Sequence, residues 1–237
     1  MTTSTPPETP ATPGLSQARF NMIEQQIRPW EVLDAQVLDL LDRVHRENFV
    51  PTAHKALAFA DMDLPLTHPA VEGQAMLAPK VEARLLQDLQ LKRTDKVLEV
   101  GTGSGHMAAL LASLAQRVVT IEIDEALARQ ARQNLQQAGI TNADVRCADA
   151  AANGFAACGV DGPYDAIVLS GSVAEIPPAL LASLAPGGRL AAIVGYEPMM
   201  RVTIVTRTGD AAYQTAQPWD TVAPRLLHFP EPSRFSF

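Results

Sequence analysis

The sequence predicts an α/β fold, a doubly wound and mostly parallel seven-stranded sheet with a helical extension at the N-terminus. Short apolar runs rich in β-branched residues alternate with segments of helix length between Leu91 and Gly195, which is the pattern of parallel strands joined by crossover helices. The first of these runs, Val97–Val100, breaks into a glycine-rich turn that opens the next helix. Acidic residues follow successive runs where each strand ends, and this edge of an open parallel sheet binds ligands.

The segment before the sheet has the composition of a tail followed by helices. Residues 1–14 are rich in Thr and Pro, so we expect a disordered tail there. Residues 15–90 are expected to form an N-terminal region of helices and loops. Residues 91–237 are expected to form the ligand-binding α/β core, with residues 15–237 as one compact unit. Apolar residues at helical spacing are expected to pack on this core at Val37, Leu40, Leu41 and Val44.

The elements of the core follow one another at regular intervals. A helix over Pro79–Leu91 is expected to lead into the first strand, and a second helix over Ser104–Ala115 to follow it. Asp124 has the position of an N-cap for a third helix, which runs to Ala138 and stops at Gly139. The later strands are expected at Val118–Glu122, Ala143–Cys147, Tyr164–Leu169, Arg189–Gly195, Val202–Arg207 and Trp219–Leu227, the last two as antiparallel additions.

The turn after the first strand indicates a ligand site. Its sequence, Gly101-Thr102-Gly103-Ser104-Gly105, has glycines at alternate positions, so that a ligand can lie against bare peptide groups at a helix N-terminus. This spacing differs from the G-x-G-x-x-G of dinucleotide-binding folds and argues against an NAD-dependent oxidoreductase. A cationic ligand that carries an amino acid, such as S-adenosylmethionine, needs close backbone and a carboxylate, and Glu99 places a carboxylate two residues before the first glycine.

Further candidate ligand-binding residues follow the strands. Glu122 ends the second strand 21 residues after Gly101, where doubly wound folds place the carboxylate that binds both ribose hydroxyls, and Ile123 follows it. Asp149, after the third strand, is expected either to approach the adenine amino group or to cap the helical stretch after it. His106, directly after the loop, is expected either over the methionine end of the ligand or packed on the loop as a first-turn helix residue.

The composition argues against several classes of protein. A chain of 237 residues with 47% hydrophobic and 19% charged residues is typical of a globule with a buried core. The net charge of −7 argues against a nucleic-acid substrate, and we expect neither a membrane span nor a secretory signal. Cys147 and Cys158 are too few for a disulfide framework, and the five histidines have no metal-binding spacing. We therefore expect no metal and a reducing, cytoplasmic setting.

Several segments besides the glycine loop resemble one known family. Upstream they are Val44–Val50 and Ala60–Pro65, and downstream Glu175–Pro177 and Gly187–Leu190, in the family's order and at its distances. Together with Leu98–Gly105 they make the chain similar to the protein-L-isoaspartate O-methyltransferases, which are class I S-adenosylmethionine-dependent methyltransferases. The resemblance covers nearly the whole chain. It implies a Rossmann-like methyltransferase fold, S-adenosylmethionine as the cofactor and isoaspartyl residues of proteins or peptides as methyl acceptors.

The chain departs from this family on the substrate side. The family has Gly-Gln-Thr-Ile-Ser, whose Ser hydroxyl faces the substrate carboxylate, whereas this sequence has Gly73-Gln74-Ala75-Met76-Leu77, so that Leu77 takes the place of the Ser. The preceding linker is longer than usual, and His106 replaces an aromatic residue. With that Ser missing, the candidate catalytic residues are Ser170, at the end of the fourth strand, and Asp61, in the upstream segment.

Three functions stay open. A carboxylate acceptor is ionised at neutral pH and needs no general base, and the sequence offers no evident base, which favours carboxyl O-methylation. The resemblance implies that isoaspartyl residues are the acceptor. The apolar run Ala75-Met76-Leu77 instead suits the same fold acting on another small-molecule acceptor. The third possibility is a cofactor-binding protein without turnover. The sequence predicts no oligomeric state.

Overall fold

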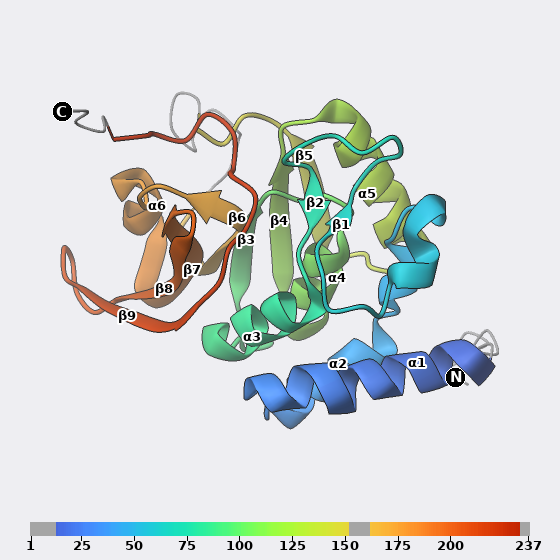
Figure 1. Ribbon diagram of the computed structural model, residues 1–237. Coiled ribbons are helices and arrows are strands. Elements are labelled where there is room, and N and C mark those ends of the chain that lie inside the picture. Colours follow the sequence, from blue (N-terminus) through green and yellow to red (C-terminus); the bar gives the residue numbers. More distant parts are fainter. Residues whose placement is uncertain (1–12, 152–161, 233–237) are drawn as a thin grey trace, which may run out of the picture.

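A seven-stranded sheet crosses the molecule in the order β5-β4-β3-β6-β7-β8-β9 (Figure 1). The computed structural model describes residues 13–151 and 162–232. The five strands from β5 to β7 run parallel, and β8 and β9 are added antiparallel. The predicted doubly wound, mostly parallel sheet is therefore confirmed. Cys158 and most of the predicted N-terminal tail lie outside the described residues.

The strands and helices have the following bounds. The sheet consists of β3 (Lys96–Val100), β4 (Arg117–Glu122), β5 (Ala143–Cys147), β6 (Tyr164–Val173), β7 (Leu184–Tyr196), β8 (Met199–Arg207) and β9 (Tyr213–Asp220). A small antiparallel pair is formed by β1 (Leu64–Pro65) and β2 (Ala75–Met76). The helices are α1 (Pro13–Met22), α2 (Ala35–Arg43), α3 (Pro79–Leu89), α4 (His106–Leu114), α5 (Glu125–Gln137) and α6 (Pro178–Ala182). Short π or 3-10 segments cover Ile23–Ile27, Arg28–Trp30, Arg46–Asn48 and Thr52–Leu57.

Local signals in the sequence explain several of these bounds. The side chain of Asp124 accepts hydrogen bonds from the N–H groups of Ala126 and Leu127, so the predicted N-cap of α5 is confirmed. Gly139 follows this helix with a φ of +72°, a left-handed conformation that ends helices and favours glycine. Pro79 begins α3, where its missing N–H has no helical partner to lose.

The two faces of the sheet are covered by different helices. Val97 of β3 packs in a cluster with side chains of α2, α3 and α4, whereas Leu98 and Val100 pack in the opposite cluster with Leu180 of α6. In Figure 1, α1 and α2 lie below the sheet and α5 lies beside β4 and β5. The predicted apolar stripe belongs to the first cluster, which confirms its expected place in the core: Val37, Leu40 and Leu41 are buried there and Val44 packs against it.

The ends of the chain differ from the prediction. Helix α1 begins at Pro13, two residues inside the predicted tail. The last strand was expected at Trp219–Leu227, and this is wrong, because β9 covers Tyr213–Asp220. All but one of the residues of β9 are exposed, so this edge strand has no alternating apolar pattern to predict it. The residues after it turn back across the ends of the central strands (Figure 1).

The sheet has a topological switch point between β3 and β6. The chain runs from β3 outward through β4 and β5, and then crosses to the other side of β3 to form β6. Ligands of open α/β sheets bind where the strand order reverses in this way, beyond the carboxyl ends of the strands. At this point the structure places the glycine loop after β3 beside Ser170 of β6.

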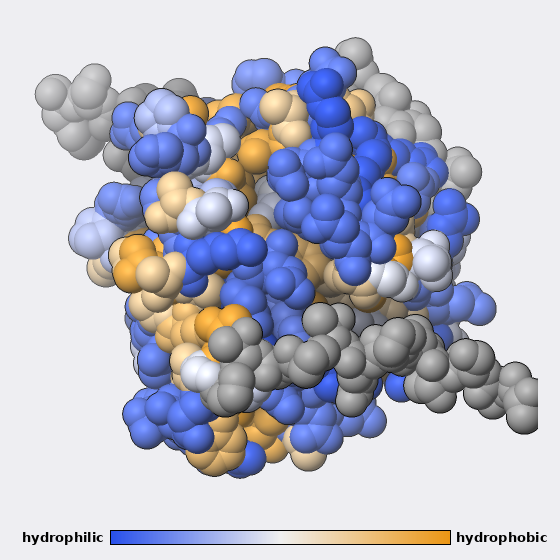
Figure 2. Space-filling model, turned by 90° about the vertical axis from the view of Figure 1, so that its right-hand side faces the viewer, coloured by the Kyte–Doolittle hydropathy of each residue, from blue (hydrophilic) through white to orange (hydrophobic). Residues whose placement is uncertain are grey.

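The face of the molecule on the right-hand side of Figure 1 is mostly polar. Figure 2 shows a face on which hydrophilic residues predominate and apolar residues form small separate groups. Among the described residues, no helix is both long and apolar enough to cross a membrane.

Candidate functional site

A pocket opens at the carboxyl ends of the central strands. It is an open pocket of about 710 Å³ when the solvent-filled mouth is included. Its walls are the glycine loop, the acidic ends of β4 and β5, the loop that leads into β2, Ser170, and the chain that follows β9. The sequence indicates the first two walls and Ser170, whereas no sequence pattern indicates the last.

The glycine loop forms one wall. Gly101 and Gly103 line the pocket with φ angles of +93° and +52°, in the left-handed region that glycine tolerates best. The N–H of Gly101 donates to the carbonyl of Ile121 on β4 at 2.9 Å, which fixes the loop against the neighbouring strand. A Cβ at Gly105 would lie 3.3 Å from the Cβ of Ala131 on α5. Two glycines therefore expose backbone to the pocket, and the third lets α4 and α5 pack closely.

The carboxylate of Glu122 joins the glycine loop to the start of α5. Its Oε2 accepts the N–H of Gly103 at 2.8 Å, and its Oε1 accepts the N–H of Asp124 at 3.0 Å. Ile123 lies on the same wall and is partly exposed. The structure thus brings both residues that were predicted at the end of this strand into the pocket.

Glu99 lies beneath the pocket and is fully buried. Its Oε2 accepts the hydroxyl of Thr120 at 2.7 Å, and its Oε1 accepts the hydroxyl of Ser170 at 2.7 Å. The hydroxyl oxygens of Thr120 and Thr102 are 2.6 Å apart, so a chain of hydrogen bonds runs from the glycine loop to Ser170. Burial raises the pKa of Glu99 to about 8, against the opposing effect of the two hydroxyl groups that bond to it. Glu99 supports two walls of the pocket from below.

The remaining residue of the loop, Ser104, is buried in the protein. Its carbonyl accepts a hydrogen bond from Nδ2 of Asn134 on α5 at 2.9 Å, and its hydroxyl oxygen lies 3.4 Å from the N–H of His106. Ser104 therefore ties the loop to the two helices behind it.

The two candidate catalytic residues are in different places. Ser170 lines the pocket. Asp61 is not among the residues that line it, and its Oδ2 lies 2.7 Å from Nζ of Lys80 on α3. The Lys80 ammonium in turn lies 4.1 Å from the ring centre of Trp30. Asp61 is thus part of a contact between α3 and the N-terminal region.

His106 belongs to a buried charged cluster that the sequence analysis missed. Its Nδ1 lies 2.9 Å from Oε2 of Glu82, and the same oxygen accepts a hydrogen bond from Arg46. Burial raises the pKa of Glu82, but His106 and Arg46 outweigh this effect and hold the pKa below its ordinary value. The His106 ring packs edge-on to Phe49, with ring centres 5.3 Å apart, so the ring contacts the region before the sheet and not the glycine loop. No local sequence signal links these residues, which lie far apart in the chain.

The apolar run on the substrate side is divided between the pocket and the core. Ala75 lines the pocket, whereas Met76 and Leu77 are buried in two different core clusters. The carbonyl of Leu77 accepts a hydrogen bond from Arg46 at 2.7 Å. The expectation that all three side chains form an apolar pocket is therefore wrong for Met76 and Leu77, because both side chains are buried in the core and do not line the pocket.

Asp149 lies on the pocket and contacts the C-terminal part of the chain. Its Oδ1 accepts the N–H of Ala151 at 2.9 Å, and the helical stretch that it was predicted to cap lies outside the described residues. Its Oδ2 lies 2.6 Å from Nδ1 of His228. Leu226 and Phe229, on either side of that histidine, also line the pocket. These residues were not predicted to bind a ligand, because the sequence pattern of Trp219–Leu227 indicates a strand.

Comparisons with known proteins agree on one family. A family model described as protein-L-isoaspartate(D-aspartate) O-methyltransferase matches residues 17–222. The chain is 38% identical over 203 residues to protein-L-isoaspartate O-methyltransferase 2 of Marinobacter nauticus, covering 85% of this chain and 89% of that protein. It is 40% identical over 177 residues to the protein-L-isoaspartate O-methyltransferase of Methanoculleus marisnigri, covering 75% of this chain and 77% of that one.

The fold is also similar to that of a solved structure. A Plasmodium falciparum protein assigned to the protein-L-isoaspartate O-methyltransferases, crystallised in complex with S-adenosyl-L-homocysteine, superposes with a TM-score of 0.71. The match has 19% sequence identity and covers 87% of this chain and 98% of that one. At this identity the likeness concerns the fold.

Proposed function

The chain belongs to the protein-L-isoaspartate(D-aspartate) O-methyltransferase family, and we propose that it transfers a methyl group from S-adenosylmethionine to the carboxylate of isoaspartyl residues in proteins or peptides. Family membership makes it a methyltransferase and confirms the resemblance inferred from the motifs. The observation that carries the proposal is the position of the pocket, at the switch point of the sheet, with the backbone of Gly101 and Gly103 on one wall and the carboxylate of Glu122 beside it.

The residues of the pocket fit this cofactor. Gly101 and Gly103 line the pocket with their backbone at positive φ angles that glycine tolerates best, and the Cβ that each lacks would lie against Leu226 or Leu66 on neighbouring walls of the pocket. Each carboxylate oxygen of Glu122 has lone pairs beyond the one backbone N–H it already accepts, so this carboxylate can also bind two ribose hydroxyls. Asp149 would accept from the adenine amino group, and Ile123 would supply an apolar surface to the ring.

Methyl transfer to a carboxylate requires little acid or base catalysis from the protein. The cofactor supplies a methyl group that its sulfonium already activates. A carboxylate acceptor is ionised at neutral pH, so no residue has to remove a proton from it. The described residues that line the pocket include no histidine, lysine or cysteine, which supports a carboxylate acceptor over an amine or a phenol. The pocket residues would bind and orient the two reactants and exclude water.

Ser170 is the side chain best placed to contact the acceptor. It lines the pocket beside Gly101, and its hydrogen bond to the buried Glu99 fixes its orientation. In the family this role falls to a Ser hydroxyl in the segment that reads Ala75-Met76-Leu77 here. We infer that Ser170 takes over part of this role.

One observation favours a second acceptor class. Ala75, on the pocket wall, presents a methyl group where the family presents a hydroxyl, so a smaller and less polar carboxylic acid would fit this wall. Methyl-transfer assays with an isoaspartyl peptide and with small aliphatic carboxylic acids separate the two possibilities. Label transfer to the peptide at the higher kcat/KM supports the proposal. Transfer to the small acids alone would replace it.

We also propose a cytoplasmic location. Cys147 is free and exposed, and thiols of this kind persist in a reducing compartment. Its alkylation by a membrane-permeant maleimide, and not by an impermeant one, in intact cells would support this location.

A further inference from the structure

The segment that follows β9 is fixed across the pocket. We call residues Ala223–Phe229 the C-terminal strap; it lies beyond residues 17–222, which the family model matches. The N–H of Ser172 donates to the carbonyl of Pro224 at 2.7 Å, and the N–H of Leu226 donates to the carbonyl of Ser172 at 2.9 Å. Figure 1 shows this part of the chain crossing in front of the central strands. The strap thus forms a short parallel bridge between Arg225 and Ser172 of β6, two residues after Ser170. This bridge holds the backbone of the strap against the sheet.

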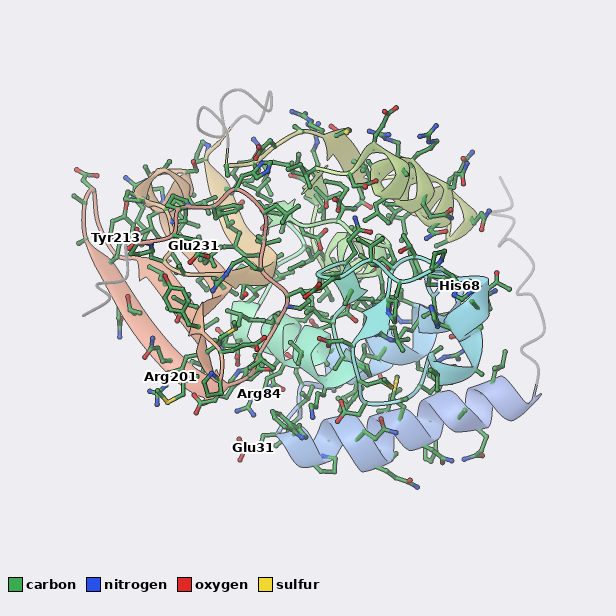
Figure 3. The ribbon with its side chains drawn as sticks, turned by 45° about the horizontal axis from the view of Figure 1, so that its top comes forward. Glu31, His68, Arg84, Arg201, Tyr213 and Glu231 are labelled. Carbon is green, nitrogen blue, oxygen red and sulfur yellow. The ribbon has the colours of Figure 1, made fainter. Side chains whose placement is uncertain are left out.

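Arg225 anchors the strap to the end of β7. Its guanidinium donates to the carbonyl of Gly195 at 2.9 Å and lies 5.2 Å from the ring centre of Tyr196. Its Nε lies 3.0 Å from Oε1 of Glu231. In Figure 3, Glu231 and His68, which lies between β1 and β2, are on opposite sides of the strand ends. Residues of the strap and residues of the loop between β1 and β2 both line the pocket.

Leu226 lies directly against the glycine loop. A Cβ at Gly101 would lie 3.0 Å from Cδ2 of Leu226, and a Cβ at Gly171 would lie 2.8 Å from the same atom. Gly101, directly after β3, and Gly171, near the end of β6, thus leave the space that the Leu226 side chain occupies. Because Leu226 also lines the pocket, it covers part of the surface that the glycines expose.

His228 reaches the predicted adenine-binding acid from the strap. Its Nδ1 lies 2.6 Å from Oδ2 of Asp149, and its φ is +64°, an uncommon conformation for a residue other than glycine. Such a conformation persists where the surrounding structure holds it. A carboxylate has about four lone-pair sites, so Asp149 can accept from His228 and from an amino group together. The histidine bond fixes the direction of the remaining lone pairs.

We propose that the C-terminal strap is part of the cofactor site, and that His228 is a positioning residue that orients Asp149 toward the adenine amino group while Leu226 covers the glycine loop. This inference rests on the proposed function, because it takes S-adenosylmethionine as the ligand. It assigns ligand binding to a segment outside the family match. In this proposal, the effect of His228 depends on the exocyclic amino group of adenine. A ligand with an oxygen in place of that amino group therefore tests the role of His228.

The experiment measures binding of S-adenosylhomocysteine and of S-inosylhomocysteine, in which a keto oxygen replaces the adenine amino group, by calorimetry to the full-length protein. The wild type should prefer the adenine ligand. His228→Ala should weaken binding of the adenine ligand about fivefold to tenfold and leave the inosine ligand nearly unchanged. His228→Gln, which keeps a donor for Asp149, should restore most of the preference.

Two matched variants control for nonspecific effects. His45 also lies beside a carboxylate, with Nδ1 3.9 Å from Oε1 of Glu47, but is not among the pocket residues, so His45→Ala should bind both ligands as the wild type does. Leu226→Ala should weaken binding of both ligands about equally, whereas Val222→Ala, just before the strap and exposed, should not.

The outcomes separate this inference from the proposed function. If the wild type binds neither ligand, the proposed cofactor is wrong and the inference falls with it. If the wild type binds S-adenosylhomocysteine and His228→Ala keeps the full preference for adenine, or loses affinity for both ligands equally, only the role of His228 is overturned. Unchanged binding by Leu226→Ala would overturn the role of the strap as a wall of the site.

Discussion

The hydroxyl of Ser170 donates a hydrogen bond to the buried carboxyl group of Glu99, with 2.7 Å between Oγ and Oε1. The other carboxyl oxygen is bonded to Thr120, whose hydroxyl contacts that of Thr102 in the glycine loop. These residues belong to the adjacent strands β4, β3 and β6 and to the loop after β3. The wall expected to contact the acceptor and the wall expected to contact the cofactor are therefore coupled through one buried acid.

This acid makes stability depend on pH. Burial raises the pKa of Glu99 to about 8 in the folded protein, from an ordinary value of 4.5. The folded state therefore keeps a proton that the unfolded state has lost. The stabilising contribution is complete below pH 4.5 and is lost as the pH rises through about 8. The Glu99→Gln side chain cannot ionise. The melting temperature of this variant should therefore fall less than that of the wild type between about pH 5 and pH 9, a range that covers most of the interval between the unfolded and folded pKa values of Glu99.

Calorimetric melting curves across this pH range measure the effect. Glu72→Gln, a change at an exposed loop glutamate, serves as the control and should follow the wild type. Parallel pH profiles for Glu99→Gln and the wild type would show that Glu99 does not titrate in this range.

Glu122 should account for much of the cofactor affinity. Glu122→Ala removes the proposed partner of two ribose hydroxyls and leaves the N–H of Gly103 without its acceptor. We expect the affinity for S-adenosylhomocysteine to fall by about 1.5–3 kcal/mol, roughly tenfold to 150-fold. Calorimetric titration measures this loss. Glu125→Ala, three residues on and exposed, should bind normally, and equal affinities for the two variants would remove Glu122 from the site.

A side chain on the glycine loop should abolish cofactor binding. At Gly101, a valine would have to adopt a φ of +93°, and its Cβ would lie 3.0 Å from Cδ2 of Leu226, a side chain that also lines the pocket. Gly139→Val is the matched control, because Gly139 has a φ of +72° but nothing lies within 4 Å of its added Cβ. Both variants should lose stability, and only Gly101→Val should lose binding in the same titration. Retained binding by a folded Gly101→Val would contradict the role of the loop.

The sequence predicts the parts of the site that are formed by residues close together in the chain. The glycine loop, Glu122 and the cap at Asp124 each follow from residues close together in the chain, and their predicted elements are present. The contact between His228 and Asp149 and the cluster of Arg46, Glu82 and His106 join distant segments, and no periodicity or spacing indicates them. The exposed edge strand β9 was misplaced for a related reason, since only pairing with β8 defines it.

The core position of Leu77 changes what a substitution there can test. Leu77→Ser would restore the family's hydroxyl in sequence, but it removes a buried apolar side chain from the main cluster. We expect a loss of about 2–5 kcal/mol in the free energy of unfolding, as for other truncations of buried leucine. Urea denaturation measures this loss. A loss below about 1 kcal/mol would show that the site tolerates a polar side chain.

Ala75 offers a cleaner test of the acceptor wall. Ala75→Thr places a hydroxyl on the pocket, and Ala75→Val places a side chain of the same shape without the hydroxyl. With an isoaspartyl peptide, the Thr variant should have a kcat/KM up to about tenfold above that of the Val variant, because one hydrogen bond to a carboxylate is gained. Equal values for the two variants would mean that the acceptor carboxylate does not reach this wall.

The central claim is methyl transfer to an isoaspartyl carboxylate, and the most direct measurement uses S-adenosylmethionine labelled in its methyl group with one peptide in its isoaspartyl and normal aspartyl forms. The account predicts label in the isoaspartyl peptide only, released as methanol at mildly alkaline pH because the product is a methyl ester, and a large loss of this label with Glu122→Ala. An enzyme that binds S-adenosylhomocysteine but leaves the isoaspartyl peptide unlabelled, or labels both isomers equally, would contradict it.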